Sequence, residues 1–141
     1  MNGNFIDIAV LEWCKLYGES KREPHHWQRI LETTEKQKHF GKQLHSYLGC
    51  TRKEWKDLRN KALTYRNEFV AHLGEKRQGD LPFLSYILTS AFYYHEYLIE
   101  HENNGHTYRD LPHDPRQYFQ DYEAEANQRY ASMRSALQAA E

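Results

Sequence analysis

The sequence predicts a single all-α domain that spans residues 1–141 and folds as an antiparallel bundle of four to five helices. The length of 141 residues and the mass of 17.0 kDa suffice for one hydrophobic core. Val and Ile together number only 7, so the residues that most favour a pleated sheet are scarce. The 11 Tyr and 3 Trp supply apolar area that the few aliphatic side chains lack, and the net charge of −1 argues against disorder.

The first helix is predicted over residues 4–17. Between Phe5 and Leu16 the apolar residues recur at steps of three and four, which is the spacing of one helix face. Gly18 follows directly, and glycine commonly ends a helix in the left-handed conformation. We therefore expect a left-handed cap at Gly18.

Two further segments follow. Pro24 opens a short segment that contains Trp27. A second helical pattern includes Phe40 and stops at Gly49, where a helix end is expected. Gly41 lies inside this pattern and weakens the helix locally, because glycine has a low helix propensity.

The clearest helix start lies at Thr51. Thr51 and Glu54 match the capping box, in which the hydroxyl and the carboxylate satisfy free amides of the first turn. Apolar residues then recur at helical spacing from Trp55 onward, and Gly74 provides a stop. The pattern predicts a long helix over residues 52–73.

The last part of the chain predicts two more helices. Pro82 occupies a first-turn position and opens a helix over residues 82–102. A polar loop with Pro112 and Pro115 follows, and residues 116–139 show the pattern of a final amphipathic helix.

The ends of the chain and its cysteines indicate a cytoplasmic protein. The N-terminal residues lack the positive leader and the apolar run of a signal peptide. The longest uncharged stretch, residues 81–94, is too short to cross a bilayer as a helix, so no membrane association is expected. Cys14 and Cys50 are far apart in the sequence, and we expect both thiols to be reduced.

The nine His suggest a metal site, but their spacing does not support one. His95 and His101 are six positions apart, whereas the zinc-hydrolase motif needs two His four apart on one helix face. His25 and His26 are adjacent and point to different sides of a helix. We expect no metal and no cofactor, and we interpret His95 as a hydrogen-bonded interior residue.

The charge is distributed unevenly along the chain. Residues 1–79 carry a net charge of +5, whereas residues 80–141 carry −6. The basic half could meet an anion such as RNA. An ordinary charge fluctuation, with the acidic half on a solvated helix, accounts for the same numbers.

One stretch near the end of the predicted 52–73 helix, residues 65–73 with the sequence YRNEFVAHL, carries a recognisable pattern. Arg66 is followed by Asn67 and, after four residues, by His72. This arrangement resembles the R-N-x4-H motif of the HEPN superfamily, compact helical bundles that include many metal-independent ribonucleases. The FVAHL ending resembles the abortive-infection branch of that superfamily.

The resemblance implies an endoribonuclease in a toxin–antitoxin or anti-phage system, with a site shared across a homodimer and an antitoxin protein as a further partner. His72 would act as general base or acid, and Arg66 would neutralise charge on the phosphoryl oxygens. Asn67 would orient His72 or the phosphate. The expected products carry a 2′,3′-cyclic phosphate.

Five cations on the first half of the same predicted helix form a candidate RNA-binding surface. They surround the helix and do not form one clean stripe. They are Arg52, Lys53, Lys56, Arg59 and Lys61.

Two alternatives remain open. Arg66 could lie on a solvated flank while His72 caps the last carbonyls of its helix. The chain as a whole could then be a non-catalytic helical dimerisation module that binds a protein or RNA partner.

Overall fold

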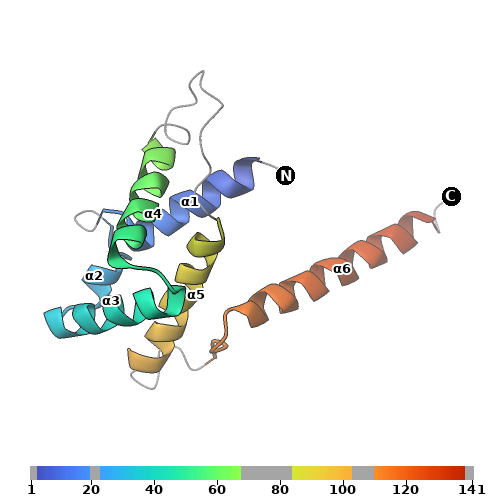
Figure 1. The fold of residues 1–141 in the computed structure, drawn as a ribbon. Helices are drawn as coiled ribbons and strands as arrows, with labels where there is room; N and C mark the ends of the chain where they lie inside the picture. The colour runs from blue at the N-terminus through green and yellow to red at the C-terminus, as the bar shows by residue number, and fades with distance from the viewer. Residues whose placement is uncertain (1–2, 20–22, 68–83, 103–109, 139–141) are drawn as a thin grey trace. The chain divides into compact units, whose positions relative to one another are not determined.

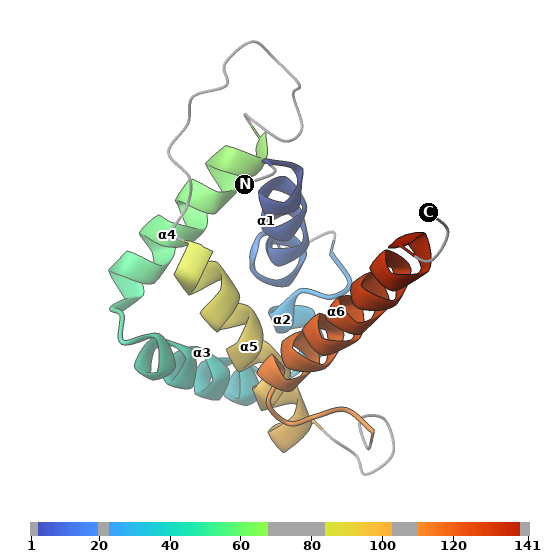
Figure 2. The same ribbon diagram turned by 90° about the vertical axis from the view of Figure 1, so that its right-hand side faces the viewer.

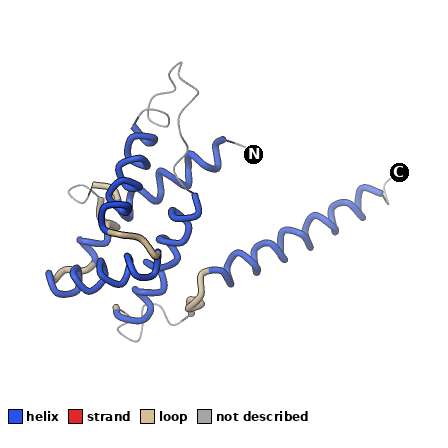
Figure 3. Tube along the Cα trace, in the orientation of Figure 1, coloured by secondary structure: helices blue, strands red, loops and turns tan. Residues whose placement is uncertain are grey.

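The computed structural model describes residues 3–19, 23–67, 84–102 and 110–138, and over these residues it confirms the all-α prediction (Figure 1). The described residues form six helices and no strand (Figure 3). The count exceeds the expected four to five because a short helix stands between the first two long ones. The helices are α1 (Gly3–Tyr17), α2 (Trp27–Ile30), α3 (Thr34–Leu48), α4 (Arg52–Tyr65), α5 (Leu84–His101) and α6 (Arg116–Gln138).

The chain divides into two compact units, residues 1–94 and residues 95–141, and the boundary falls inside α5. None of the described helices combines the length and the apolar character needed to cross a bilayer.

Local caps explain where α3 ends and where α4 begins, as the sequence predicts. Gly49 follows α3 with φ 61° and ψ 30°, the left-handed conformation that glycine adopts at low cost. At the start of α4 the Thr51 hydroxyl accepts a hydrogen bond from the Glu54 amide at 3.2 Å. The Glu54 carboxylate accepts one hydrogen bond from the Thr51 amide and one from the Thr51 hydroxyl, each at 2.7 Å, and these two bonds lower the pKa of Glu54. The capping box is confirmed.

The expected left-handed cap at Gly18 is wrong. The Gly18 amide donates to the Cys14 carbonyl at 2.8 Å and so continues the helical hydrogen-bond pattern. Among the described residues, only Gly49 has a positive φ. Glycine is needed at position 18 for a steric reason, because a Cβ there would collide with the Cys14 carbonyl oxygen and stand 3.2 Å from Leu63 Cδ2. A single helix pattern does not show this approach of α4.

An aromatic core fills the first unit, as the Tyr and Trp content predicts. Trp13, Tyr17 and Phe40 are buried, and the Tyr17 ring stacks on Phe40 with centroids 6.4 Å apart. The polar atoms of this core are satisfied. Trp13 Nε1 donates to Ser90 Oγ at 2.8 Å, and the Tyr17 hydroxyl donates to the Ser90 carbonyl at 2.7 Å. Residues from α1, α3 and α5 thus share one core.

α1 and α4 run antiparallel and side by side (Figure 2). Near the start of α1, Asp7 accepts a hydrogen bond from the Tyr65 hydroxyl at 2.8 Å. At the other end of α1, Arg59 donates from Nε to the Tyr17 carbonyl at 2.7 Å and from Nη2 to the Gly18 carbonyl at 2.5 Å. Arg59 therefore satisfies carbonyls that the end of α1 leaves without a helical partner.

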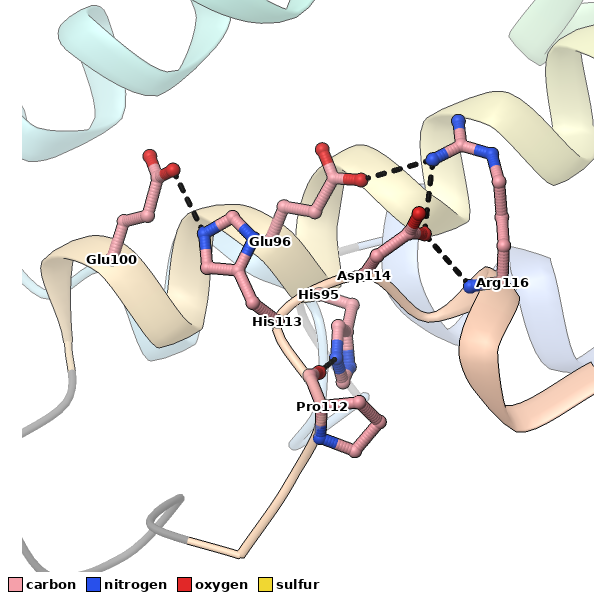
Figure 4. Close-up of polar contacts among 7 residues, drawn as sticks. All are labelled: His95, Glu96, Glu100, Pro112, His113, Asp114 and Arg116. Carbon is pink, nitrogen blue, oxygen red and sulfur yellow. Dashed lines mark hydrogen bonds and ion pairs between the residues drawn. The ribbon is translucent and has the colours of Figure 1, made fainter. Parts of the chain in front are cut away.

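In the second unit, polar contacts fasten the segment before α6 to the last turns of α5 (Figure 4). His95 Nε2 lies 2.8 Å from the Pro112 carbonyl oxygen, so the predicted hydrogen bond is confirmed, while the residue is half-buried and not fully interior. His113 Nε2 lies 2.9 Å from Glu100 Oε1. Arg116 Nη1 donates to Glu96 at 3.3 Å, which ties the first turn of α6 to α5.

Candidate nucleic-acid interface

The predicted cleavage motif begins where α4 ends. α4 stops at Tyr65, and Arg66 follows as its C-cap with right-handed helical angles, φ −53° and ψ −48°. The Tyr65 hydroxyl holds this end of α4 against α1 through its bond to Asp7. Burial and that carboxylate raise the pKa of Tyr65 to about 12, so the phenol keeps its proton and remains a donor at neutral pH. His72 lies outside the described residues, so the structure brings together Arg66 and Asn67 of the predicted set.

The side chains of Arg66 and Asn67 interact directly. Arg66 Nε donates to Asn67 Oδ1 at 3.0 Å, which fixes one edge of the planar guanidinium. Arg66 Nη2 lies 3.9 Å from a carboxylate oxygen of Glu19, and the Glu19 side chain is 67% exposed. An ion pair at that distance and exposure is weak, so it neutralises the guanidinium only in part.

The structure separates the five predicted RNA-binding cations. Arg52, Lys56 and Arg59, at positions i, i+4 and i+7, line one groove. Lys61 lines a different hollow, where Glu54 and Asp57 accompany it. The fifth cation, Lys53, is exposed and lines neither of these two hollows.

The groove lies between α2, α3 and α4 and has a volume of about 830 Å³; we call it the basic groove. No acidic residue is among the described residues that line it. Its lining includes five residues with a permanent positive charge, together with His26, His45 and two Trp. The five cations are Lys38, Lys42, Arg52, Lys56 and Arg59.

Sequence reasoning missed the α3 side of the basic groove. Lys38, Lys42 and His45 follow the same i, i+4, i+7 spacing as the cations of α4. This spacing places them on one helix face and could have been found from the sequence. The sequence does not show that the α3 row and the α4 row line the same groove, because this depends on how the short connection between α3 and α4 turns the chain.

The two histidines of the groove are neutral at pH 7. Burial, and secondly the charge of Arg59, lower the pKa of His26. Burial and then Arg52 lower the pKa of His45 in the same way. The permanent charge of the groove at pH 7 therefore comes from its Lys and Arg side chains.

Arg59 and His26 also have structural roles at the wall of the groove. Arg59 bonds to two carbonyl oxygens, which carry no net charge, so these bonds leave its positive charge in place. His26 caps α2, since its Nδ1 accepts a hydrogen bond from the Gln28 amide at 3.2 Å. The loss of either side chain would change the fold as well as the groove.

The hollow that Lys61 lines is smaller, about 440 Å³, and mixes charges of both signs with Cys50. Burial raises the pKa of the Cys50 thiol, and the Glu54 charge adds to this. The other cysteine, Cys14, is buried, and its pKa is raised to about 11. Both thiols are free and protonated at neutral pH, so neither is a ready nucleophile.

No group of three or more His, Cys, Asp or Glu side chains suited to a metal ion occurs within the described part of the chain. Comparison with protein-family models, curated proteins and solved structures finds no match to the chain. A functional assignment therefore depends on two features of the chain itself, the Arg66-Asn67 motif and the basic groove.

Proposed function

We propose that the protein is a metal-independent endoribonuclease of the HEPN type, acting in toxin–antitoxin or anti-phage defence. The observation that carries the proposal is the Arg66-Asn67-x4-His72 pattern at the end of the best-capped helix of an all-α fold. The direct Arg66–Asn67 contact supports it, because a guanidinium held at one edge is preorganised for a phosphate.

The chemistry requires one proton to leave the 2′-hydroxyl and another to reach the leaving oxygen. An imidazole from His72 takes the 2′-hydroxyl proton while the 2′-oxygen attacks the adjacent phosphorus. The bond from phosphorus to the 5′-oxygen breaks, and a second imidazole protonates that oxygen. Arg66 stabilises the charge on the phosphoryl oxygens, and Asn67 orients Arg66 or His72. The products are a 2′,3′-cyclic phosphate and a 5′-hydroxyl.

Two histidines are needed in this scheme, and each chain offers one R-N-x4-H motif. A second copy of the chain supplies the other, which makes the active species a homodimer. An antitoxin protein is the expected partner that restrains it.

The test is cleavage of total RNA or tRNA by the purified full-length protein in the presence of a chelator. We expect His72→Ala and Arg66→Ala to lower the cleavage rate by about a hundredfold or more, the range typical of a lost acid–base or charge-stabilising group. Lys53→Ala is the matched control, because Lys53 is an exposed cation of α4 that lines neither hollow. End-group analysis should detect the 2′,3′-cyclic phosphate.

Two results would overturn the proposal. One is RNA that stays intact with the wild-type protein. The other is cleavage by His72→Ala and Arg66→Ala at the rate of wild type, with circular dichroism showing that both variants are folded.

The basic groove favours a second candidate function, a non-catalytic helical module that binds RNA. The groove brings together five cations without an acidic lining residue, and this holds whether or not His72 is catalytic. Tight RNA binding without any cleavage by the wild-type protein would select this function.

A further inference from the structure

We propose that the basic groove binds the backbone of single-stranded RNA, with Trp27 as the surface on which a base stacks. The inference rests on the proposed function for its choice of RNA as ligand. It adds a binding surface that is separate from the Arg66-Asn67 motif and includes residues of α2 and α3.

The charge of the groove argues for a polyanion. Lys38 and Lys42 on α3, with Arg52, Lys56 and Arg59 on α4, place five positive charges around one open hollow. The α4 cations cover seven residue steps, about 10 Å of helix, which matches about three phosphates of a stacked strand. A ligand with one isolated negative charge would use only part of this surface.

The aromatic residue argues for a single strand. Trp27 is half-buried, lines the groove, and stacks on Phe40 with ring centroids 4.9 Å apart and an interplanar angle of 21°. A rigidly held indole beside a row of cations is the combination that single-strand binders use, because every base has a face that can stack. The other Trp of the groove, Trp55, is also half-buried, and it packs edge-on against the buried rings of Trp13 and Tyr17.

The shape of the site agrees with this choice. A groove of about 830 Å³ has the size of a site that takes up one small molecule or a few nucleotide units. Duplex RNA is recognised across its wide minor groove and its phosphates, without stacking on protein side chains. The groove therefore fits a flexible single strand better than a duplex.

The experiment measures fluorescence anisotropy of a labelled single-stranded RNA of twelve nucleotides with full-length His72→Ala protein in a chelator, so that binding is read without cleavage. The matching duplex and a polyglutamate peptide serve as competitors. We expect the single strand to bind most tightly. The plot of log K against log salt should have a slope of about −3.5 if all five cations meet phosphates.

Two double variants locate the binding surface. Lys42→Gln with Lys56→Gln removes one cation from each row, and we expect it to weaken binding about tenfold or more and to make the salt slope shallower by about 1.4. Arg129→Gln with Arg134→Gln removes the same charge from exposed residues of α6 that line neither hollow, and this variant should bind nearly as wild type. Trp27→Ala should weaken binding by about fivefold to a hundredfold if it remains folded.

The groove proposal fails if both double variants weaken binding equally, or if the duplex or polyglutamate binds as tightly as the single strand. Its failure is distinct from that of the nuclease proposal. Wild-type protein that binds RNA through the groove but leaves it intact would overturn only the nuclease proposal. Wild-type protein that cleaves RNA, with a groove double variant that binds as well as the control, would overturn only the groove proposal.

Discussion

Gly18 and Gly41 differ in what a side chain would meet at each position. A Cβ at Gly18 would collide with the Cys14 carbonyl oxygen and press on Leu63, whereas a Cβ at Gly41 would meet nothing within 4 Å. Gly41 also lies inside α3, where alanine has the higher helix propensity.

We therefore expect opposite effects of one substitution at these two sites. Gly18→Ala should lower the free energy of unfolding by about 1–3 kcal/mol, because the backbone at the end of α1 must shift away from the added Cβ and the Leu63 side chain must give way. Gly41→Ala should raise it by about 0.5–1 kcal/mol. Urea unfolding followed by circular dichroism measures both values, and equal shifts in the same direction would contradict the steric account of Gly18.

For single residues, the sequence indicates a role but does not identify a partner that is distant in the chain. His95 was interpreted as a hydrogen-bonded residue from its place on an apolar stripe, and it bonds to the Pro112 carbonyl. Arg59 was predicted as an RNA-binding residue, but it also holds the end of α1, 42 positions earlier in the chain. A spacing pattern within one helix contains no information on that partner.

At the scale of elements, α2 depends on a capping side chain that can titrate. His26 is buried, accepts a hydrogen bond from the Gln28 amide and has a lowered pKa. Its pKa is thus lower in the folded chain than in the unfolded chain, where it is about 6.5. The unfolded chain binds this proton first, so the contribution of neutral His26 to stability is present above about pH 6.5 and is lost as the pH falls below it.

The measurement compares the wild type with His26→Asn, since asparagine can cap a helix but does not titrate. Between pH 7.5 and pH 5.5 the free energy of unfolding of the wild type should fall more than that of the variant. The lowered pKa of His45 acts on both proteins alike and cancels in the comparison. Parallel pH profiles would show that His26 does not carry this dependence.

The ends of elements were predicted where a local signal marks them. Thr51, Glu54 and Gly49 placed the end of α3 and the start of α4, because caps act within one turn. The predicted 52–73 helix agrees with α4 at its start, while its last residues lie outside the described ones. The basic groove was only half predicted, because its two rows come from two helices and each row by itself resembles an ordinary solvated face.

At the scale of the whole molecule, the proposed homodimer has a kinetic consequence. If each active site draws residues from two chains, the cleavage rate per chain must fall when dilution separates the copies. Light scattering should then show a mass near twice 17.0 kDa at the concentrations where cleavage is fast. A monomeric mass with an unchanged rate per chain over the same dilution series would exclude a shared site.

The structure also shows where part of the positive charge of residues 1–79 lies. The five cations of the basic groove belong to the basic half, residues 1–79, and to the first compact unit. The net charge of −1 therefore conceals a strongly positive hollow. Composition alone could indicate the imbalance, but only the fold shows that cations of α3 and α4 line one groove.

The two roles of Arg59 affect how a mutational scan of this protein should be interpreted. Arg59 lines the groove and also holds the carbonyls at the end of α1. In a mutational scan scored by cellular activity, substitutions of Arg59 should therefore reduce the score more than substitutions of Lys42 or Lys56. The loss of Arg59 removes hydrogen bonds that stabilise the end of α1 as well as a positive charge. Such a ranking would measure protein abundance as much as affinity for a ligand, and selection would preserve arginine at this position even in descendants that had lost the activity.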